Sequence, residues 1–396
     1  MPDNHPGFTF VNRVVLKNYR SIAACDVRLG PLTFLVGPNG AGKSNFLDAL
    51  CLVSASLRSS IEHAMRDRGG INQIRRRSGG HPTDFGIRLD FRLPDGQIGY
   101  FAFEVGAKKA GGFIVKQEDC AIGPASYSVK AGELASKSQT VMPPAADDRL
   151  YLVSAAGLPE FRPSFDALSR MGFYNIRPET IRKHQEPDEG DLLNRDGSNL
   201  ASVIRRMKDS SNGTLRRVQE YLSQVVPGIE GVEYKPVGHL ETLEFRQQVE
   251  NQSGPWRFPA INMSDGTLRA LSILVALFQP GVRSRVPLIG IEEPEAALHP
   301  AAAGVVLDAL MSGSRETQVV ITSHSPDLLE APVLTADDIL AVEAIGGRTI
   351  IGQVDEASRS ALSERLYTAG ELLRSNQLHT DPTAVPDQLD LFQRIG

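Results

Sequence analysis

The residues with the clearest chemical potential lie in the segment PLTFLVGPNGAGKSNFLDAL, residues 31–50. Gly37, Gly42, Lys43 and Ser44 fit the spacing G-x-x-x-x-G-K-[ST] of a P-loop, whose glycines let backbone N–H groups surround a phosphate. In such a loop the lysine reaches the β- and γ-phosphates, and the hydroxyl binds Mg²⁺. Lys43 is expected to contribute charge at an exposed loop and little packing. An apolar stretch precedes the segment and a helical pattern follows it. This context favours a phosphate-binding loop over a chance glycine-rich turn.

A second candidate site is the acidic end of VPLIGIEEPEAALHP, residues 286–300. A strand is expected over residues 287–291, and it runs directly into Glu292 and Glu293. One carboxylate of such a pair can hold Mg²⁺, while the next can polarise an attacking water. A strand that simply ends in a charged loop is the alternative interpretation.

Two further features stand at the ends of expected elements. His324 follows an apolar strand over residues 319–321, where sites of α/β proteins collect, and it could hydrogen-bond a terminal phosphate. A lone histidine at such a place is more often structural. Ser264, Asp265 and Gly266 open a helix that stays apolar as far as Gln279. Ser264 alone could cap that helix, so a capped and buried helix is the simpler interpretation.

The pattern of the whole chain predicts the elements that must position these residues. Residues 8–36 read as strands, and residues 84–105 alternate around a Pro-Asp-Gly turn, which predicts a β-hairpin. The stretch up to about residue 150 predicts loosely ordered loops and edge strands. Residues 160–226 look mainly helical, and residues 240–260 look like strand. From residue 261 onward, apolar strands alternate with helices, which favours a buried parallel sheet, and a helical piece over residues 363–378 precedes a polar tail.

Composition narrows the class of protein. The 396 residues suit one large lobed domain or two, and the net charge of −5 argues against a uniformly basic nucleic-acid binder. The spacing of the three cysteines fits neither a disulfide framework nor a zinc site, which suggests a reducing compartment. No signal peptide is evident, no apolar stretch is long enough to span a membrane, and no heptad pattern persists. A cytoplasmic location is expected.

The order of the motifs resembles the core of the ABC-type ATPases: P-loop, Ser-Asp-Gly helix start, acidic strand end and strand-end histidine. The segments LKNYRSI, GPNGAGKSN, MSDGTLRAL, EEPEAALHP and ITSHSPDLL resemble the RecF/SMC-like branch. Within it they are similar to compact bacterial ATPases related to the ATPase module of overcome-lysogenisation-defect (OLD) nucleases. YNIRPETIR, DGSNLASVI and GELLRSNQL also look like family positions, so the resemblance covers most of the chain.

This resemblance implies a role for each matching residue. Glu292 would be the Walker B acid, Glu293 the catalytic base and His324 the switch histidine, with a D-loop over residues 296–299. Mg²⁺ would be held by Ser44 and Glu292. In the family two heads face each other, so Ser264, Asp265 and Gly266 would act as a signature motif on the γ-phosphate held by a second copy. The ATP-binding residues would be Arg20, Ser21, Gly37, Pro38, Asn39, Gly40, Ala41, Gly42, Lys43, Ser44 and Asn45.

The sequence departs from the family pattern in several places. Glu292 stands where the broader ABC family has aspartate, and Gln73 is a candidate Q-loop residue whose alternative is a solvated polar side chain. The insertion between P-loop and signature is too short for SMC-type coiled-coil arms. No Asp-x-Asp pair follows His324, so no nuclease module is expected. The best basic patch for DNA, with solvated faces as the alternative, comprises Arg66, Arg68, Arg75, Arg76 and Arg77. Further arginines that could extend it are Arg205, Arg206, Arg216 and Arg217.

The expected fold is α/β: an ABC-type ATPase head with a mixed sheet, a parallel core sheet and flanking helices. An N-lobe over residues 1–125 would contain the P-loop and an antiparallel β subdomain. A mainly helical subdomain would follow over residues 126–260, and a C-lobe over residues 261–396. The expected function is that of an ATPase that dimerises on ATP. It would serve anti-phage defence or genome maintenance, beside a separate effector protein such as a nuclease or toxin. A DNA-repair ATPase that binds DNA directly and an ATP-locked scaffold with little turnover are the alternatives.

Overall fold

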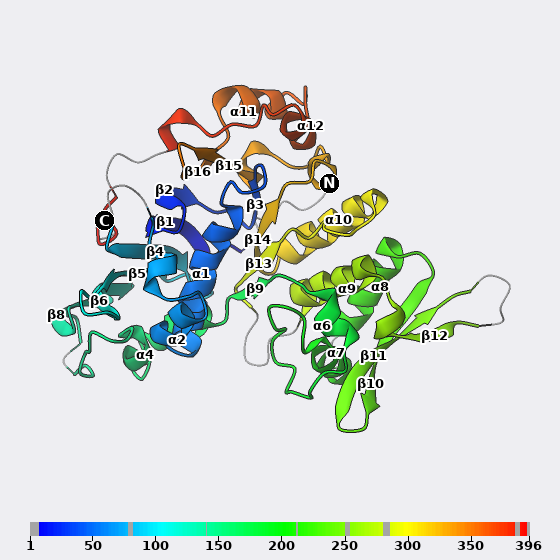
Figure 1. Cartoon of the computed structure of the whole chain (residues 1–396), viewed down its shortest axis with the longest axis horizontal. Coiled ribbons are helices and arrows are strands. Elements are labelled where there is room, and N and C mark those ends of the chain that lie inside the picture. The colour runs from blue at the N-terminus through cyan, green and yellow to red at the C-terminus, as the bar shows by residue number, and fades with distance from the viewer. Residues whose placement is uncertain are drawn as a thin grey trace. The chain divides into compact units, whose positions relative to one another are not determined.

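The computed structural model in Figure 1 describes residues 8–77, 82–139, 141–210, 213–249, 254–279, 286–384 and 389–393. The chain forms two compact units. We call Thr9–Met171, Thr335–Tyr367 and Leu372–Gly396 the P-loop unit, and Met1–Phe8, Gly172–Leu334 and Thr368–Glu371 the signature unit. The lobes expected over residues 1–125, 126–260 and 261–396 stay a prediction. No signal peptide was expected at the start of the chain, and the structure describes the chain from residue 8.

The P-loop unit is built on a mixed sheet, which confirms the expected fold class. Its strand order is β8-β7-β6-β5-β4-β1-β2-β16-β15-β3. The pairs β2/β16 and β3/β15 are parallel, and the other neighbours are antiparallel. The strands are β1 (Val11–Tyr19), β2 (Ile22–Arg28), β3 (Leu32–Val36), β4 (Asp84–Arg92), β5 (Ile98–Ala107), β6 (Phe113–Ile122), β7 (Ala125–Lys130), β8 (Glu133–Lys137), β15 (Ile339–Ile345) and β16 (Arg348–Gln353).

The helices of this part of the chain are short apart from α1, which follows β3. They are α1 (Lys43–Arg58), α2 (Ile61–Arg66), α3 (Ile71–Ile74), α4 (Leu152–Ala155), α5 (Arg162–Ser169) and α11 (Glu356–Ser363). The helix α12 (Ala369–Arg374) follows near the end of the chain. The single helical piece expected over residues 363–378 is therefore wrong. It is interrupted where Arg365 takes a left-handed φ of 56°, which ends α11.

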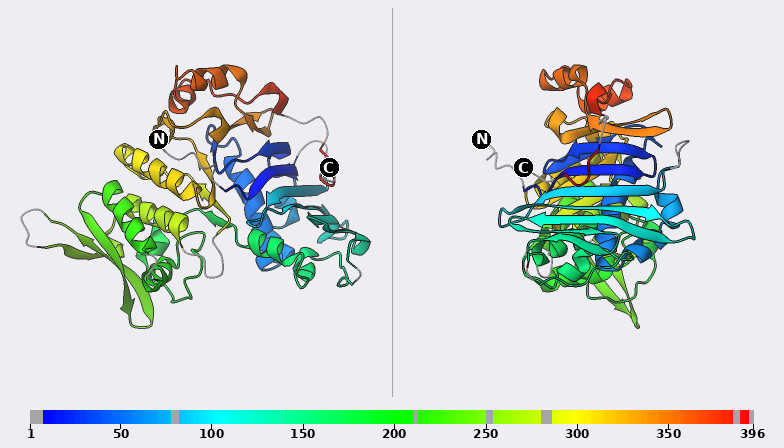
Figure 2. Two further views of the ribbon diagram at one scale, coloured as in Figure 1. Left: turned by 180° about the vertical axis from the view of Figure 1, so that it is seen from behind. Right: turned by 90° about the vertical axis from the view of Figure 1, so that its left-hand side faces the viewer.

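The hairpin expected around the Pro-Asp-Gly turn is confirmed, because β4 and β5 pair in antiparallel register from Asp84 to Arg92. Of the loosely ordered loops and edge strands expected after it, the edge strands are present but the loose order is wrong. Strands β6, β7 and β8 extend the sheet in order, and the right-hand view of Figure 2 shows the long cyan strands side by side. Their inward side chains, among them Val115, Cys120 and Tyr127, are buried. The many small and polar residues of this stretch hid that period-2 pattern.

The signature unit contains a parallel sheet of order β14-β13-β9, with β9 (Gly172–Tyr174), β13 (Leu288–Glu292) and β14 (Gln318–Ser323). This confirms the expected parallel strands. Its helices are α6 (Pro178–Arg182), α7 (Leu200–Asp209), α8 (Thr214–Val225), α9 (Asp265–Phe278) and α10 (Ala303–Ser314). A separate antiparallel sheet consists of β10 (Ile229–Val237), β11 (Leu240–Gln247) and β12 (Trp256–Pro259). Sequence patterns missed β9 and β10.

Burial explains why α9 carries so few polar residues. Nearly every side chain from Thr267 to Phe278 is buried, and the helix packs against α8 and α10. Tyr221 of α8 stacks on Phe278, with ring centroids 5.6 Å apart. A helix that is apolar on all sides is stable in water only when neighbouring elements cover it. In the described part of the chain, no helix combines the length and apolar character needed to cross a membrane.

A buried carboxylate ties the antiparallel strands to the segment that follows them. Glu118 of β6 is fully buried and accepts hydrogen bonds from the Tyr127 hydroxyl at 2.7 Å and from the backbone N–H groups of Tyr151 and Leu152 at 2.6 and 2.8 Å. It therefore caps the start of α4 from a different element. Burial raises the pKa of Glu118 to about 7, although the three hydrogen bonds act in the opposite direction.

This pKa predicts a pH-dependent stability. Because the folded-state pKa lies above the unfolded value, the contribution of Glu118 is fully present below about pH 4.5 and is lost as the pH rises through about 7. The free energy of unfolding should fall by up to about 3 kcal/mol across this window. Urea denaturation of wild type and Glu118→Gln at pH 5 and pH 8 measures it. The variant should lack this component, and identical pH profiles for the two proteins would contradict the assignment.

Candidate functional site

The loop between β3 and α1 has the geometry of a phosphate cradle. All five residues of β3 are buried, and the strand pairs in parallel with β15. At Gly37, directly after the strand, a Cβ atom would lie 2.0 Å from the Val342 carbonyl oxygen, so only glycine fits. At Gly42 the backbone φ is 106°, and a Cβ atom would lie 2.1 Å from Thr349 Oγ1. Both glycines of the motif are therefore required by the backbone path.

The start of α1 is suited to bind an anion. Gly42 is its N-cap, no side chain caps it, and its first turn contains no acidic residue. The N–H groups at such a helix start carry a partial positive charge that phosphate neutralises. Ser44, the expected Mg²⁺ ligand, is exposed at this start. Its hydroxyl is the kind of hard oxygen donor that Mg²⁺ accepts.

A chain of hydrogen bonds from α1 through two distant segments supports the loop. Asn45 Nδ2 donates to Ser21 Oγ at 2.6 Å, and Ser21 Oγ lies 2.7 Å from Thr349 Oγ1. Thr349 in turn donates to the carbonyl oxygen of Ala41 within the loop, also at 2.7 Å. The structure thus brings together the sequence-predicted Ser21 and Asn45. Sequence reasoning missed Thr349, because a threonine in a strand carries no signal of a tertiary contact.

The Lys43 side chain is more buried than the sequence predicted. We expected it on an exposed loop with little packing, but only 5% of the residue is accessible. Its Nζ donates to the carbonyl oxygens of Gly37 at 2.7 Å and Pro38 at 3.0 Å. The lysine therefore spans the loop from inside, because the backbone carbonyls of residues 37 and 38 face its ammonium group. Phosphate oxygens would replace these neutral carbonyls with a charge-assisted partner.

Arg20 lies beside α1, held by an acidic residue that the sequence did not single out. Its Nη2 lies 2.9 Å from Asp48 Oδ2, while Arg68 Nε lies 2.9 Å from Asp48 Oδ1 and the Tyr19 hydroxyl donates to the same carboxylate at 2.7 Å. Burial raises the pKa of Tyr19, so the phenol stays neutral. The candidate Q-loop residue Gln73 is exposed on the four-residue helix α3. Its role stays a prediction.

The signature residues form the exposed N-terminus of α9. Ser264 is the N-cap, and its Oγ accepts from the Thr267 backbone N–H at 3.2 Å. Asp265 forms an ion pair with Arg182 of α6. At Gly266 a Cβ atom would lie 2.4 Å from the Ala297 carbonyl oxygen, so the helix start packs closely on the expected D-loop. Ser264 thus caps α9, as the simpler interpretation predicted, and its proposed role as a signature residue stays a prediction.

The first acidic residue after β13 is paired with an arginine. Arg195 Nη2 donates to Glu292 Oε1 at 2.8 Å. The Glu292 side chain is 15% exposed and that of Arg195 is 46% exposed, so the arginine approaches the carboxylate from the solvent side. A carboxylate at the end of a parallel strand offers the oxygen ligand that Mg²⁺ prefers. Sequence reasoning missed Arg195, which directly precedes DGSNLASVI, a segment that carries only the family resemblance.

Glu293 and His324 lie together at the ends of neighbouring strands. Glu293 has a left-handed φ of 45°, and its N–H donates to the Thr322 carbonyl oxygen at 3.0 Å. His324 Nδ1 lies 3.3 Å from Glu293 Oε1, although their orientation does not make a hydrogen bond. A residue with a strained backbone persists only where the surrounding structure holds it, and such residues cluster at functional sites. The two residues that we expected to act in catalysis are thus neighbours.

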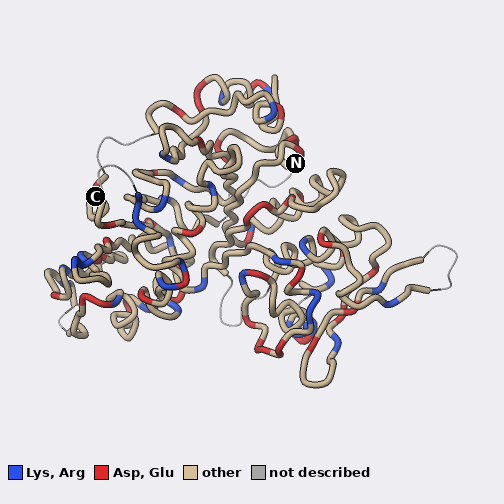
Figure 3. The backbone as a smooth tube through the Cα atoms, viewed as in Figure 1, with Lys and Arg blue, Asp and Glu red and all other residues tan. Residues whose placement is uncertain are grey.

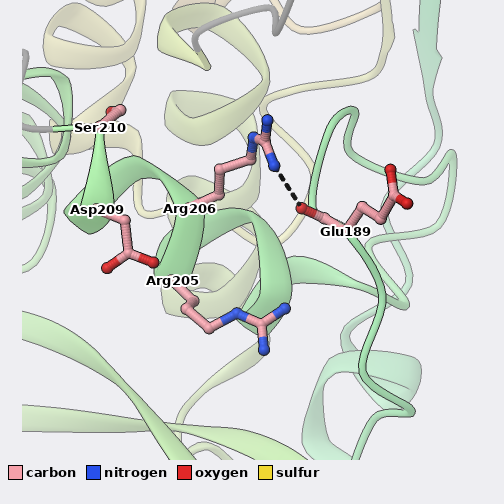
Figure 4. Close-up of a pocket in the computed structure, with 5 residues that line it drawn as sticks. All are labelled: Glu189, Arg205, Arg206, Asp209 and Ser210. Atoms are coloured by element: carbon pink, nitrogen blue, oxygen red, sulfur yellow. Dashed lines mark hydrogen bonds between the residues drawn. The ribbon is translucent and has the colours of Figure 1, made fainter.

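Most arginines of the proposed basic patch are held by other groups of the chain. Arg205 Nη2 donates to the Asp188 carbonyl oxygen, and Arg217 lies 3.2 Å from Glu316 and over the Phe278 ring. Figure 4 shows Arg206 reaching the Glu189 carbonyl oxygen, at 3.2 Å, across a cavity of about 400 Å³. Basic and acidic positions are interspersed along the trace in Figure 3. These contacts favour solvated, internally paired faces over a DNA groove.

The cysteines carry no metal or disulfide chemistry in the described structure. Cys25, Cys51 and Cys120 are free and buried. Within the described ranges, no group of three or more histidine, cysteine, aspartate or glutamate side chains could hold a metal ion unaided. A P-loop metal site takes most of its ligands from water and phosphate, so a single hydroxyl or carboxylate from the chain suits it.

Comparison with known proteins agrees with this geometry. Residues 131–330 match the family described as "AAA domain, putative AbiEii toxin, Type IV TA system", and residues 10–142 match an AAA ATPase domain. The chain is 22% identical to the OLD nuclease of Thermus scotoductus over 89% of its own length and 66% of that protein. It is 36% identical to the DNA replication and repair protein RecF of Magnetococcus marinus over 25% of this chain and 26% of that protein. The chain thus spans less than two thirds of each relative.

Solved structures show the same fold. An Smc head bound to the C-winged helix domain of ScpA matches 88% of this chain and 99% of its own, with a TM-score of 0.55 and 17% identity. The Smc head domain with an extended coiled coil, bound to the C-terminal domain of ScpA and derived from Pyrococcus furiosus, has a TM-score of 0.56 and 14% identity, over 90% of this chain and 99% of its own. The chain therefore belongs to the AAA-domain family matched over residues 131–330, and it is an ABC-type ATPase of the RecF/SMC/OLD-like kind.

Proposed function

We propose that the protein binds and hydrolyses ATP with Mg²⁺ and that two copies associate head to head around the nucleotide. The observation that carries the proposal is the loop of residues 37–44, which places Lys43 inside an uncapped helix start. The helix-start amides and Lys43 bind the phosphates, and Ser44 and Glu292 hold the metal. When bound, Mg²⁺ neutralises phosphate charge and orients the terminal phosphate.

In this proposal Glu293 accepts a proton from the attacking water, and His324 orients the terminal phosphate. The closeness of the two side chains, 3.3 Å between Nδ1 and Oε1, supports a shared task. Arg195 donates to Glu292 Oε1, so the arginine and the metal would share one anionic group. The N-terminus of α9 offers its amides to the γ-phosphate of the second copy.

The biological role that we propose is a motor or sensor subunit in anti-phage defence or genome maintenance, beside an effector such as a nuclease or toxin. The names of the matched family and relatives support this role: a Type IV toxin–antitoxin description, an OLD nuclease and a repair protein. A DNA-repair ATPase that binds DNA directly remains the second candidate, supported by the RecF match. A salt-dependent affinity for duplex DNA distinguishes it.

Lys43→Ala should abolish ATP binding, because the loop loses the only side-chain charge aimed at the phosphates within residues 37–44. Contrary to the sequence expectation, the variant should also lose stability, on the order of 1–3 kcal/mol, since the buried Gly37 carbonyl oxygen and the partly buried Pro38 carbonyl oxygen lose their donor. Calorimetry with ATP and a urea denaturation curve measure both effects. Lys43→Arg controls for charge alone. ATP affinity like wild type in Lys43→Ala would remove the phosphate-binding assignment.

Ser264→Arg should block association of two copies while each copy still binds ATP. A long cation would stand at the helix start that must approach the opposing nucleotide. Ser264→Ala is the matched control, because it also removes the cap, which costs about 1 kcal/mol, but adds no bulk. Light scattering with Mg²⁺ and ATP reports association. Normal dimer formation by Ser264→Arg would leave Ser264 as a helix cap alone.

Glu293→Gln should trap an ATP-bound dimer, because glutamine keeps the size of the side chain but cannot accept the proton. Turnover should fall about a hundredfold or more, and the accumulated ATP would favour the dimer by mass action. Glu292→Gln should instead weaken Mg²⁺–ATP binding itself. Turnover assays and light scattering on both variants test this. The roles of the two carboxylates are reversed if only Glu292→Gln gives the long-lived dimer, and hydrolysis unchanged in both removes the acidic strand end from the mechanism.

A further inference from the structure

A third carboxylate stands beside Glu293 and His324. Glu295 follows Pro294 in the sequence EEPEAALHP. Its position is set by two successive turns, in which the Ala296 N–H donates to the Glu293 carbonyl oxygen and the Leu298 N–H donates to that of Glu295, both at 3.0 Å. The Glu295 side chain is only 10% exposed. The chain therefore brings a charged group inward at this turn.

Glu295 joins this turn to the end of β14. Its Oε1 accepts from Ser323 Oγ at 2.8 Å and from the His324 backbone N–H at 3.2 Å. Ser323 Oγ also accepts from the Ser325 N–H at 3.1 Å, so both sides of His324 are tied to one carboxylate oxygen. The backbone that carries the imidazole has little freedom to rotate while these bonds hold.

Two buried polar atoms in this cluster have no hydrogen-bond partner among the described residues. They are Glu295 Oε2 and His324 Nδ1. His324 Nδ1 lies 3.9 Å from Glu295 Oε1 and 3.3 Å from Glu293 Oε1, so both carboxylates face the same edge of the ring. A buried carboxylate that satisfies only part of its bonding capacity is costly for a fold, which argues that the position serves the site.

Resting on the proposed hydrolysis, we infer that Glu295 is a positioning residue that fixes His324 with its Nδ1 edge toward Glu293. It acts through the Ser323 hydroxyl and the His324 amide and does not itself touch the nucleotide. Loss of these two bonds frees the backbone at residues 323–325, so the imidazole no longer keeps its place beside Glu293. The rate of the chemical step then falls, while nucleotide affinity is unchanged because the loop of residues 37–44 is intact.

The test compares Glu295→Ala with Glu295→Gln. The amide oxygen of glutamine can accept both hydrogen bonds, whereas alanine accepts neither. Glu295→Ala should lower kcat about tenfold or more and leave KM for ATP within about twofold, and Glu295→Gln should restore most of the rate. Ser323→Ala, which removes one of the two donors, should fall between them. Asp308→Ala, at an exposed position of α10, is the matched control and should behave like wild type.

A second measurement does not depend on turnover. The imidazole signal of His324, assigned by its loss in His324→Gln, is recorded by NMR of histidine-labelled protein without nucleotide. It should shift and broaden in Glu295→Ala and stay near its wild-type position in Glu295→Gln. An unmoved signal in Glu295→Ala overturns the inference, and so does a folded Glu295→Gln as slow as Glu295→Ala. A wild type without ATP turnover refutes the proposed function, but the NMR comparison still decides the role of Glu295.

Discussion

The close approach of neighbouring strands at Gly37 and Gly42 is the constraint on which the conformation of the loop of residues 37–44 depends. A carbonyl of β15 and a hydroxyl of β16 occupy the space where side chains at these positions would lie. The loop is therefore shaped by the last two strands of the sheet, and Thr349 of β16 lies 308 positions after Ala41 of the loop. Because the loop backbone is fixed in advance, its amides would need little reorganisation to meet a phosphate, whereas the Lys43 ammonium group would exchange its two carbonyl partners for phosphate oxygens.

In the signature unit, the main constraint is the strained turn that follows β13. Glu293 and Ala297 both have positive φ, a conformation that costs on the order of 1–3 kcal/mol at each non-glycine residue. Hydrogen bonds from the Glu293 amide to β14 and from Ser323 to Glu295 offset that strain. Gly266 lies against the Ala297 carbonyl oxygen, so the turn also limits how α9 begins. The acidic pair, the expected D-loop and the signature helix start are consequently one packed body.

Many arginine side chains of this protein are paired with nearby groups of the same unit. Most of the arginines that could have formed a nucleic-acid surface are engaged with other groups of their own unit; Arg205, Arg216 and Arg217, for example, contact carboxylates, carbonyls or aromatic rings. Arg195 lies on the carboxylate that is expected to meet a metal ion, and Arg20 lies on Asp48. A count of basic residues therefore says little about a binding surface, because the paired guanidinium groups contribute small net fields beyond their partners.

Sequence periodicity was sufficient for the elements with strong local signals. The β4–β5 hairpin, the strands before the P-loop and the alternation of α9, β13, α10 and β14 all follow their apolar patterns, since burial of one face or of a whole strand leaves a direct trace in residue order. Apolar patterns did not predict the three-residue strand β9, the strand β10 or the regular pairing of β6 to β8. Short strands and strands rich in small polar residues carry little period-2 signal.

The same division holds for the site. The motif spacing by itself determined the loop of Gly37 to Ser44, the acidic strand end and His324, because glycine, lysine and carboxylate chemistry at fixed intervals is a local property. The burial of Lys43, the support from Thr349, the pairing of Arg195 with Glu292 and the inward turn of Glu295 were decided only by the tertiary structure. Each of these depends on a contact between segments far apart in the chain, and residue order does not record which distant atoms meet.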